Sequence, residues 1–125
     1  MDIVTLQIDV KNFPFPLVVK FLDGRMWELM GNFEYHRNCG DIIKVPVGFK
    51  FDFASIPQPF WGWIGSPTGE YGPAALVHDF LCVTKPYKQS KIDYIFYEAM
   101  RDLKIVAWKR CLMYSAVRLW HIFQP

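Results

Sequence analysis

The strongest constraint on the fold is a segment dense in proline and glycine that divides the chain. Seven of the nineteen residues from 54 to 72 are proline or glycine, a density that excludes long regular structure there. The same segment carries large aromatic side chains at Phe60, Trp61 and Trp63, which do not suit a solvated tether. We therefore expect a loop that packs on the domain and shapes a cleft or an interface.

The residues before this segment predict short β-strands. Runs rich in Val, Ile, Phe, Tyr and Trp alternate with turn residues. The dipeptide Asp23-Gly24 is typical of a tight hairpin turn, because both residue types tolerate the positive φ that such turns need. We expect an antiparallel sheet. Its predicted strands are residues 17–22, 25–30, 33–37, 42–45 and 49–53.

The residues after the segment predict three helices. The first is apolar except for His78 and Asp79, so it must be largely buried. The second has Ser90 as a candidate N-cap and carries Asp93 at the edge of its apolar stripe. The predicted helices span about 73–83, 90–103 and 107–122.

The third predicted helix mixes large apolar and basic side chains. We expect its apolar side chains to face inward and its basic side chains to face solvent. The inward set is Trp108, Leu112, Leu119, Trp120 and Phe123, and the outward set is Lys109, Arg110 and Arg118. The charge of the chain is uneven, with −3 over residues 1–84 and +5 over residues 85–125. A basic end of this kind suits nucleic acid or anionic lipid, or an ordinary solvated helix surface.

These patterns predict one α+β domain over residues 1–125. An N-terminal antiparallel β-sheet (1–53) is followed by the loop rich in proline, glycine and aromatic residues (54–72) and by three C-terminal α-helices (73–123). A chain of 125 residues can bury a core without disulfides or a metal. Its 52% hydrophobic and 18% aromatic content is high, so we expect part of the apolar surface to be buried against a partner.

Cysteine usage and the N-terminus bear on the compartment. Cys39, Cys82 and Cys111 are odd in number and form no CxxC pair, which argues against a secreted disulfide framework. No signal peptide is recognisable, and no stretch is long and apolar enough for a transmembrane segment. We expect a soluble protein in a reducing compartment.

His78 and Asp79 are the chief candidates for a functional site. A buried ionisable side chain is costly unless it is hydrogen-bonded or charge-paired. Successive helical residues diverge by about 100°, so each of the two needs its own partner. Asp93 is the expected acceptor for one ring nitrogen of His78, which would leave the other nitrogen free to activate a water. A structural pair that locks two helices fits the same residues, and both interpretations stay open.

Other residues have both functional and structural interpretations. Asp52 and Ser55 suit ligands or substrate contacts at a cleft, but they also suit turn or cap positions ahead of a proline. His121 suits a helix C-terminus, where the dipole favours positive charge. Two His–Cys pairs have spacings found in zinc sites, although such pairs are common by chance. They are His36 with Cys39 and His78 with Cys82.

Three ordered motifs resemble the phage and prophage family catalogued as domain of unknown function 1353. They are VPVGFKFDFASIPQPFW (45–61), YGPAALVHDFL (71–81) and KIDYIFYEAMRDL (91–103), and the resemblance extends to Leu119. It implies a viral origin and no established activity. We therefore expect a small structural or assembly component of a bacteriophage virion, in the tail or head–tail region, located in the virion or the host cytoplasm. Other phage structural proteins would be its partners, contacted through Phe60, Trp61 or Trp63.

A second resemblance implies an alternative function. VHDFL (77–81) and IDYIFYEAM (92–100) are similar to the paired helices of phospholipases of the A-two type. On that resemblance His78 would deprotonate water, Asp93 would orient His78, and Asp79 would ligate calcium, the one cofactor suggested, together with carbonyls of a loop matched loosely by residues 61–65. The alternative is a calcium-dependent phospholipase-like esterase with a phospholipid substrate. A nucleic-acid or host-factor binding protein is the second alternative.

Overall fold

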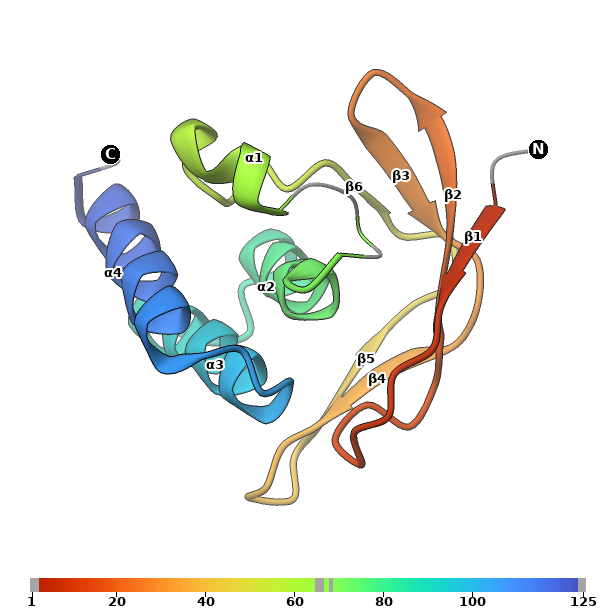
Figure 1. Ribbon diagram of the computed structural model, residues 1–125, viewed down its shortest axis with the longest axis horizontal. Coiled ribbons are helices and arrows are strands. Elements are labelled where there is room, and N and C mark those ends of the chain that lie inside the picture. The colour runs from red at the N-terminus through yellow and green to blue at the C-terminus, as the bar shows by residue number, and fades with distance from the viewer. Residues whose placement is uncertain (1–2, 65–66, 68, 124–125) are drawn as a thin grey trace. The chain divides into compact units, whose positions relative to one another are not determined.

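The chain forms two compact units, Met1–Asp52 and Phe53–Pro125, in a computed structural model that describes residues 3–64, 67 and 69–123. The first unit consists of β-strands and the second is mainly helical (Figure 1). Strands come first and three long helices last, which confirms the predicted α+β class. The expectation that both units belong to one domain stays a prediction.

The first unit holds two antiparallel sheets where the sequence predicted one. Its larger sheet has the strand order β1-β2-β3-β6, and its smaller sheet pairs β4 with β5. The strand β1 was not among the predicted ones. The strands are β1 (Ile3–Leu6), β2 (Leu17–Asp23), β3 (Met26–Leu29), β4 (Phe33–His36), β5 (Ile42–Val45) and β6 (Lys50–Phe51).

The predicted hairpin connects β2 and β3. Gly24 adopts a φ of 55° in its turn, and Val19 pairs with Leu29 across the ladder. In the same unit, the Phe13 ring stacks on Tyr35 with a centroid separation of 4.8 Å. Residues on one face of β4 are buried and those on the other are half-buried, the period of two expected for a strand with one face in a core.

Among its described residues, the proline- and glycine-rich segment contains only short helical turns. They are η1 (Gln58–Phe60) and α1 (Trp61–Ile64). The Trp61 indole donates a hydrogen bond of 2.8 Å to the Ile56 carbonyl, so the segment packs partly on itself. The segment ends at Gly72, where two parts of the chain approach closely. A Cβ at this position would lie 1.6 Å from the Pro67 carbonyl oxygen, so the site requires glycine. The side chain of Trp63, a predicted interface residue, lies outside the described part.

Three long helices complete the second unit, each within about two residues of its predicted ends. They are α2 (Gly72–Thr84), α3 (Gln89–Asp102) and α4 (Ala107–Phe123). The middle helix, α3, packs against both α2 and α4 (Figure 1). Within the described residues, no helix has the length and apolar character needed to cross a membrane.

The expected orientation of α4 is wrong. The apolar side chains that were expected to face inward are exposed, including Trp108 at 63%, Leu119 at 56% and Phe123 at 79%, whereas Met113 and Val117 are buried. Two of its basic side chains point instead toward α3, where Arg110 binds the Tyr97 hydroxyl and Arg118 binds Asp93. Asp93 is fully buried and needs donors, so packing favours the orientation of α4 in which Arg118 reaches it.

Candidate functional site

The centre of the site is His78, which the apolar helix α2 carries into the interior. Its side chain is 0% exposed, and its Nε2 lies 2.8 Å from Asp93 Oδ1 on α3. This contact confirms the predicted pairing of the two helices through His78 and Asp93. The Phe96 ring covers the imidazole at a centroid distance of 4.8 Å, which adds apolar packing to the ion pair.

Asp93 accepts hydrogen bonds from four side chains, of which the sequence predicted only His78. Arg118 Nη1 binds its Oδ2 at 2.7 Å, His121 Nδ1 lies 3.0 Å from its Oδ1, and Gln89 Nε2 lies 2.9 Å from the same oxygen. Burial alone would raise the pKa of Asp93, but the bonds from His121, His78, Arg118 and Gln89 outweigh it and lower that pKa below its usual range. Asp93 is therefore an ionised hub between α3 and α4.

The electrostatics favour a protonated His78. Burial lowers the pKa of an imidazole, but the hydrogen bond to Asp93 and the contact with Cys82 outweigh burial and raise the pKa of His78 to about 9. Its second ring nitrogen, Nδ1, lies 3.0 Å from Ser55 Oγ, so it is not free to activate a water as the sequence suggested. With its ring charged and both nitrogens bonded, His78 has no lone pair free to accept a proton from water.

Asp79 binds the turn that precedes η1. Its Oδ2 accepts a 2.8 Å bond from the Phe53 N–H, and its Oδ1 accepts a short bond from Ser55 Oγ. Phe53 has a φ of 62°, a strained conformation for a bulky side chain, and the bond to Asp79 helps to hold it. Both oxygens of Asp79 thus face donors, an arrangement that does not suit the calcium ligand implied by the phospholipase resemblance.

The other residues predicted to accompany His78 and Asp79 are Asp52, Ser55 and a calcium loop, and among the described residues only Ser55 is seen at the site. Ser55 joins the site, where it bridges His78 and Asp79. It does not cap η1, which has no side-chain capping bond. Asp52 belongs to the other unit, and the predicted calcium loop includes Gly65, which lies outside the described residues.

One continuous chain of hydrogen bonds follows from these contacts. With His78 protonated, Nε2 donates to Asp93, Nδ1 donates to Ser55, and the Ser55 hydroxyl donates to Asp79. Each of these donors meets an acceptor, so the polar groups along this series of hydrogen bonds are satisfied. These hydrogen bonds join the turn at residues 53–55 to α2 and α3, and Asp93 extends them to α4 through Arg118 and His121.

Cysteine and histidine side chains gather beside this network. The ligand atoms of His78, Cys82 and His121 all lie within 4.8 Å of one another. The other predicted zinc pair does not extend to a third ligand within the described residues, and His36 binds Glu34 instead.

The sequence reasoning missed Gln89, Arg118 and His121. Arg118 and His121 are three residues apart and so share one face of a helix, which was a usable signal. The sequence alone predicts an outward basic side chain at Arg118 and a partner of the helix dipole at His121, because the buried acid that binds both residues lies on another helix.

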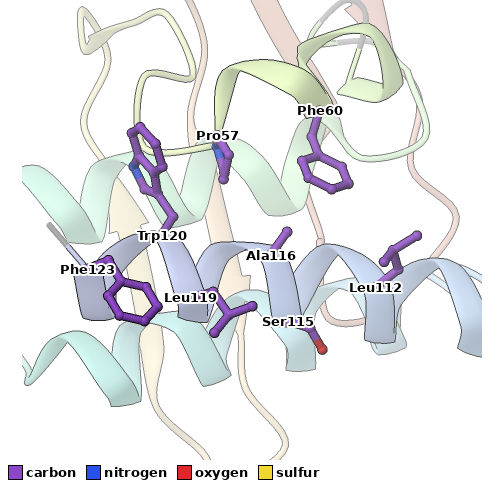
Figure 2. Close-up of a pocket in the computed structure, with 8 residues that line it drawn as sticks. All are labelled: Pro57, Phe60, Leu112, Ser115, Ala116, Leu119, Trp120 and Phe123. Atoms are coloured by element: carbon purple, nitrogen blue, oxygen red, sulfur yellow. The ribbon is translucent and has the colours of Figure 1, made fainter.

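An apolar groove lies between α4 and the segment that carries Pro57 and Phe60 (Figure 2). Its volume is about 550 Å³. Pro57 and Phe60 form one wall, and residues of α4 form the other. The α4 residues are Leu112, Ser115, Ala116, Leu119, Trp120 and Phe123.

Comparison with known proteins identifies the family. The family model described as "Protein of unknown function (DUF1353)" matches residues 27–117. A similar protein, "Uncharacterized protein y4jT" of Sinorhizobium fredii (strain NBRC 101917 / NGR234), is 39% identical over 93 residues, which are 74% of this chain. The match spans only 28% of that relative's length. No solved structure matches the chain. The chain belongs to the family of proteins of unknown function DUF1353.

Proposed function

We propose that this protein is a small structural component of an assembly and associates with further copies of itself through α4. The observation that carries the proposal is the outward apolar face of α4. The buried site also supports the proposal. Asp93 binds Arg118 and His121, and these contacts fix which face of α4 points outward.

The exposed face of α4 has the spacing of a helix-packing seam. Its residues repeat at alternating steps of four and three, as in helices that pack side by side along their length. They are Trp108, Leu112, Ser115, Leu119 and Ile122, all exposed and none charged. An uncharged seam suits an apolar partner and does not suit the nucleic-acid alternative, which needs free basic side chains.

A second copy is the occupant that this surface fits. Three residues of the seam, Leu112, Ser115 and Leu119, also line the groove between α4 and Phe60 (Figure 2). An exposed apolar surface of this kind can pack on the same surface of a second copy related by a twofold axis. Large aromatic side chains at such a contact contribute most of the binding energy.

The virion is the setting in which we place this assembly, on the basis of the resemblance to phage and prophage proteins. The measurement is the protein content of phage particles that are purified after induction of a prophage. The prophage encodes either the wild-type chain or the Leu119→Glu variant. We expect the wild-type chain in the particles and at least tenfold less of the variant, because a buried carboxylate without a partner opposes the contact.

Val83→Glu is the matched control, because Val83 is 71% exposed on α2, away from the groove. It should enter particles like wild type. Equal incorporation of Leu119→Glu and Val83→Glu, or absence of the wild-type chain, would contradict the proposal.

The esterase alternative keeps one supporting observation, the His78–Asp93 pair. Its test is the calcium-dependent release of fatty acid from phospholipid vesicles by wild type and by His78→Asn. We expect no release by wild type, because His78 is buried and charged. Release that falls by about 100-fold in the variant, the scale of losing a positioned base, would instead establish the esterase.

A further inference from the structure

We propose that His78, Cys82, His121 and Asp93 form a binding site for one zinc ion, which ties α2, α3 and α4 together. The proposal goes beyond the assembly function and does not depend on it. The pair His78 and Cys82 lies one helical turn apart on α2, and the other two residues reach the same place from α4 and α3.

The separations of the four side chains suit a tetrahedral ion. Zinc bonds of about 2.0–2.3 Å place neighbouring ligand atoms roughly 3.3–3.8 Å apart. Cys82 Sγ lies 3.7 Å from His78 Nε2, and Asp93 Oδ1 lies 2.8 Å from His78 Nε2 and 3.0 Å from His121 Nδ1. The ligand atoms of His78, Cys82 and His121 lie within 4.8 Å of one another, so small shifts, outward for Asp93 and inward for the others, bring all four into the range of a coordinated ion.

The Gln89 side chain occupies the position that we propose for the ion. Its amide nitrogen lies 2.9 Å from Asp93 Oδ1 and 3.4 Å from both Cys82 Sγ and His121 Nδ1. A donor group thus contacts three of the four proposed ligands at once. Gln89 is half-buried at the first residue of α3, so its side chain can turn outward when an ion takes its place.

The surroundings hold the proposed ligands as a metal site requires. A ligating histidine usually donates its second ring N–H to an oxygen, and His78 Nδ1 already faces Ser55 Oγ, which in turn binds Asp79. Arg118 holds the second oxygen of Asp93, which leaves Oδ1 directed at the cluster.

Ligand type indicates the ion. Two imidazoles, a thiolate and a carboxylate suit zinc, and four protein ligands form a closed structural site without a position for substrate. Binding displaces the thiol proton of Cys82 and the proton that His78 shares with Asp93, so two protons are released per ion when both sites are protonated.

The test uses Co²⁺ as a spectroscopic probe and Zn²⁺ as its competitor. The full chain, stripped with a chelator and kept reduced, should bind one Co²⁺ with a sulfur-to-cobalt charge-transfer band, and one equivalent of Zn²⁺ should displace it. Cys82→Ser should remove that band, and His121→Asn should weaken Zn²⁺ binding by more than about 100-fold. Circular dichroism checks that both variants stay folded.

Cys39 and Cys111 provide the matched control, since both are exposed and lie outside the cluster. The double variant Cys39→Ser, Cys111→Ser should keep the band and the affinity. A band that survives Cys82→Ser, unchanged Zn²⁺ affinity in His121→Asn, or wild-type chain that binds neither ion would overturn the proposal.

Discussion

Asp93 is the residue on which the second unit most depends. It is fully buried and faces His78, His121 and Arg118. A single carboxylate thus neutralises positive charge from two helices at once. Removal of its charge would leave buried cations without a counterion, which costs more than the loss of an ordinary hydrogen bond.

Asp93→Asn should therefore lower the free energy of unfolding of metal-free protein by about 3–5 kcal/mol, the usual cost of breaking a buried pair. Urea denaturation followed by circular dichroism measures this change. Glu70→Gln is the control, because its pair with Lys109 is exposed and such pairs contribute at most about 1 kcal/mol. Equal effects of the two substitutions would contradict the role of Asp93 as a buried hub.

The protonation of His78 gives the stability a defined pH dependence. Its pKa is raised from 6.5 to about 9, so its contribution is fully present below pH 6.5 and is lost as the pH rises through 9. We expect the stability advantage of wild type over His78→Asn, measured by urea denaturation in chelator, to shrink across this window. Parallel stability curves from pH 6.5 to above 9 would show that His78 is not charged in the fold.

At the scale of elements, the sequence predicted the helices and several strands well because local patterns determine them. The Asp23-Gly24 turn and the apolar run around His78 are signals carried by neighbouring residues. The orientation of α4 is not a local property. Its apolar and basic residues predicted the opposite arrangement, and a carboxylate on another helix decides the outcome. The position of Ser55 beside His78 depends likewise on tertiary packing.

The end of α3 offers a test of backbone strain. Lys104 follows the helix with a φ of 65°, a conformation that costs a residue with a Cβ roughly 1–2 kcal/mol and costs glycine little. Lys104→Gly should therefore raise the free energy of unfolding by about 0.5–1 kcal/mol. Arg101→Gly, at an exposed position inside the same helix, should lower it by about 1 kcal/mol. Destabilisation by Lys104→Gly in urea denaturation would contradict this account.

At the scale of the whole molecule, the chain combines a β unit with a helical unit. In the helical unit a buried polar network lies between the helices, and α4 carries an exposed apolar surface. The network holds α2, α3 and α4 through His78 and Asp93, and α4 presents Leu119 and its neighbours outward. The high apolar content of the sequence led us to expect a partner surface. The exposed side chains of α4 are the reason why we propose that surface there rather than on the aromatic segment alone.

Sedimentation equilibrium over a range of concentrations tests most directly whether the outward face of α4 binds a second copy of the chain, as we propose. Wild type should show a reversible shift from the 14.7 kDa monomer to a dimer. Leu119→Glu should stay monomeric, and Val83→Glu should dimerise like wild type. A wild-type chain that remains monomeric at every concentration, or a dimer that Leu119→Glu leaves unchanged, would contradict the account.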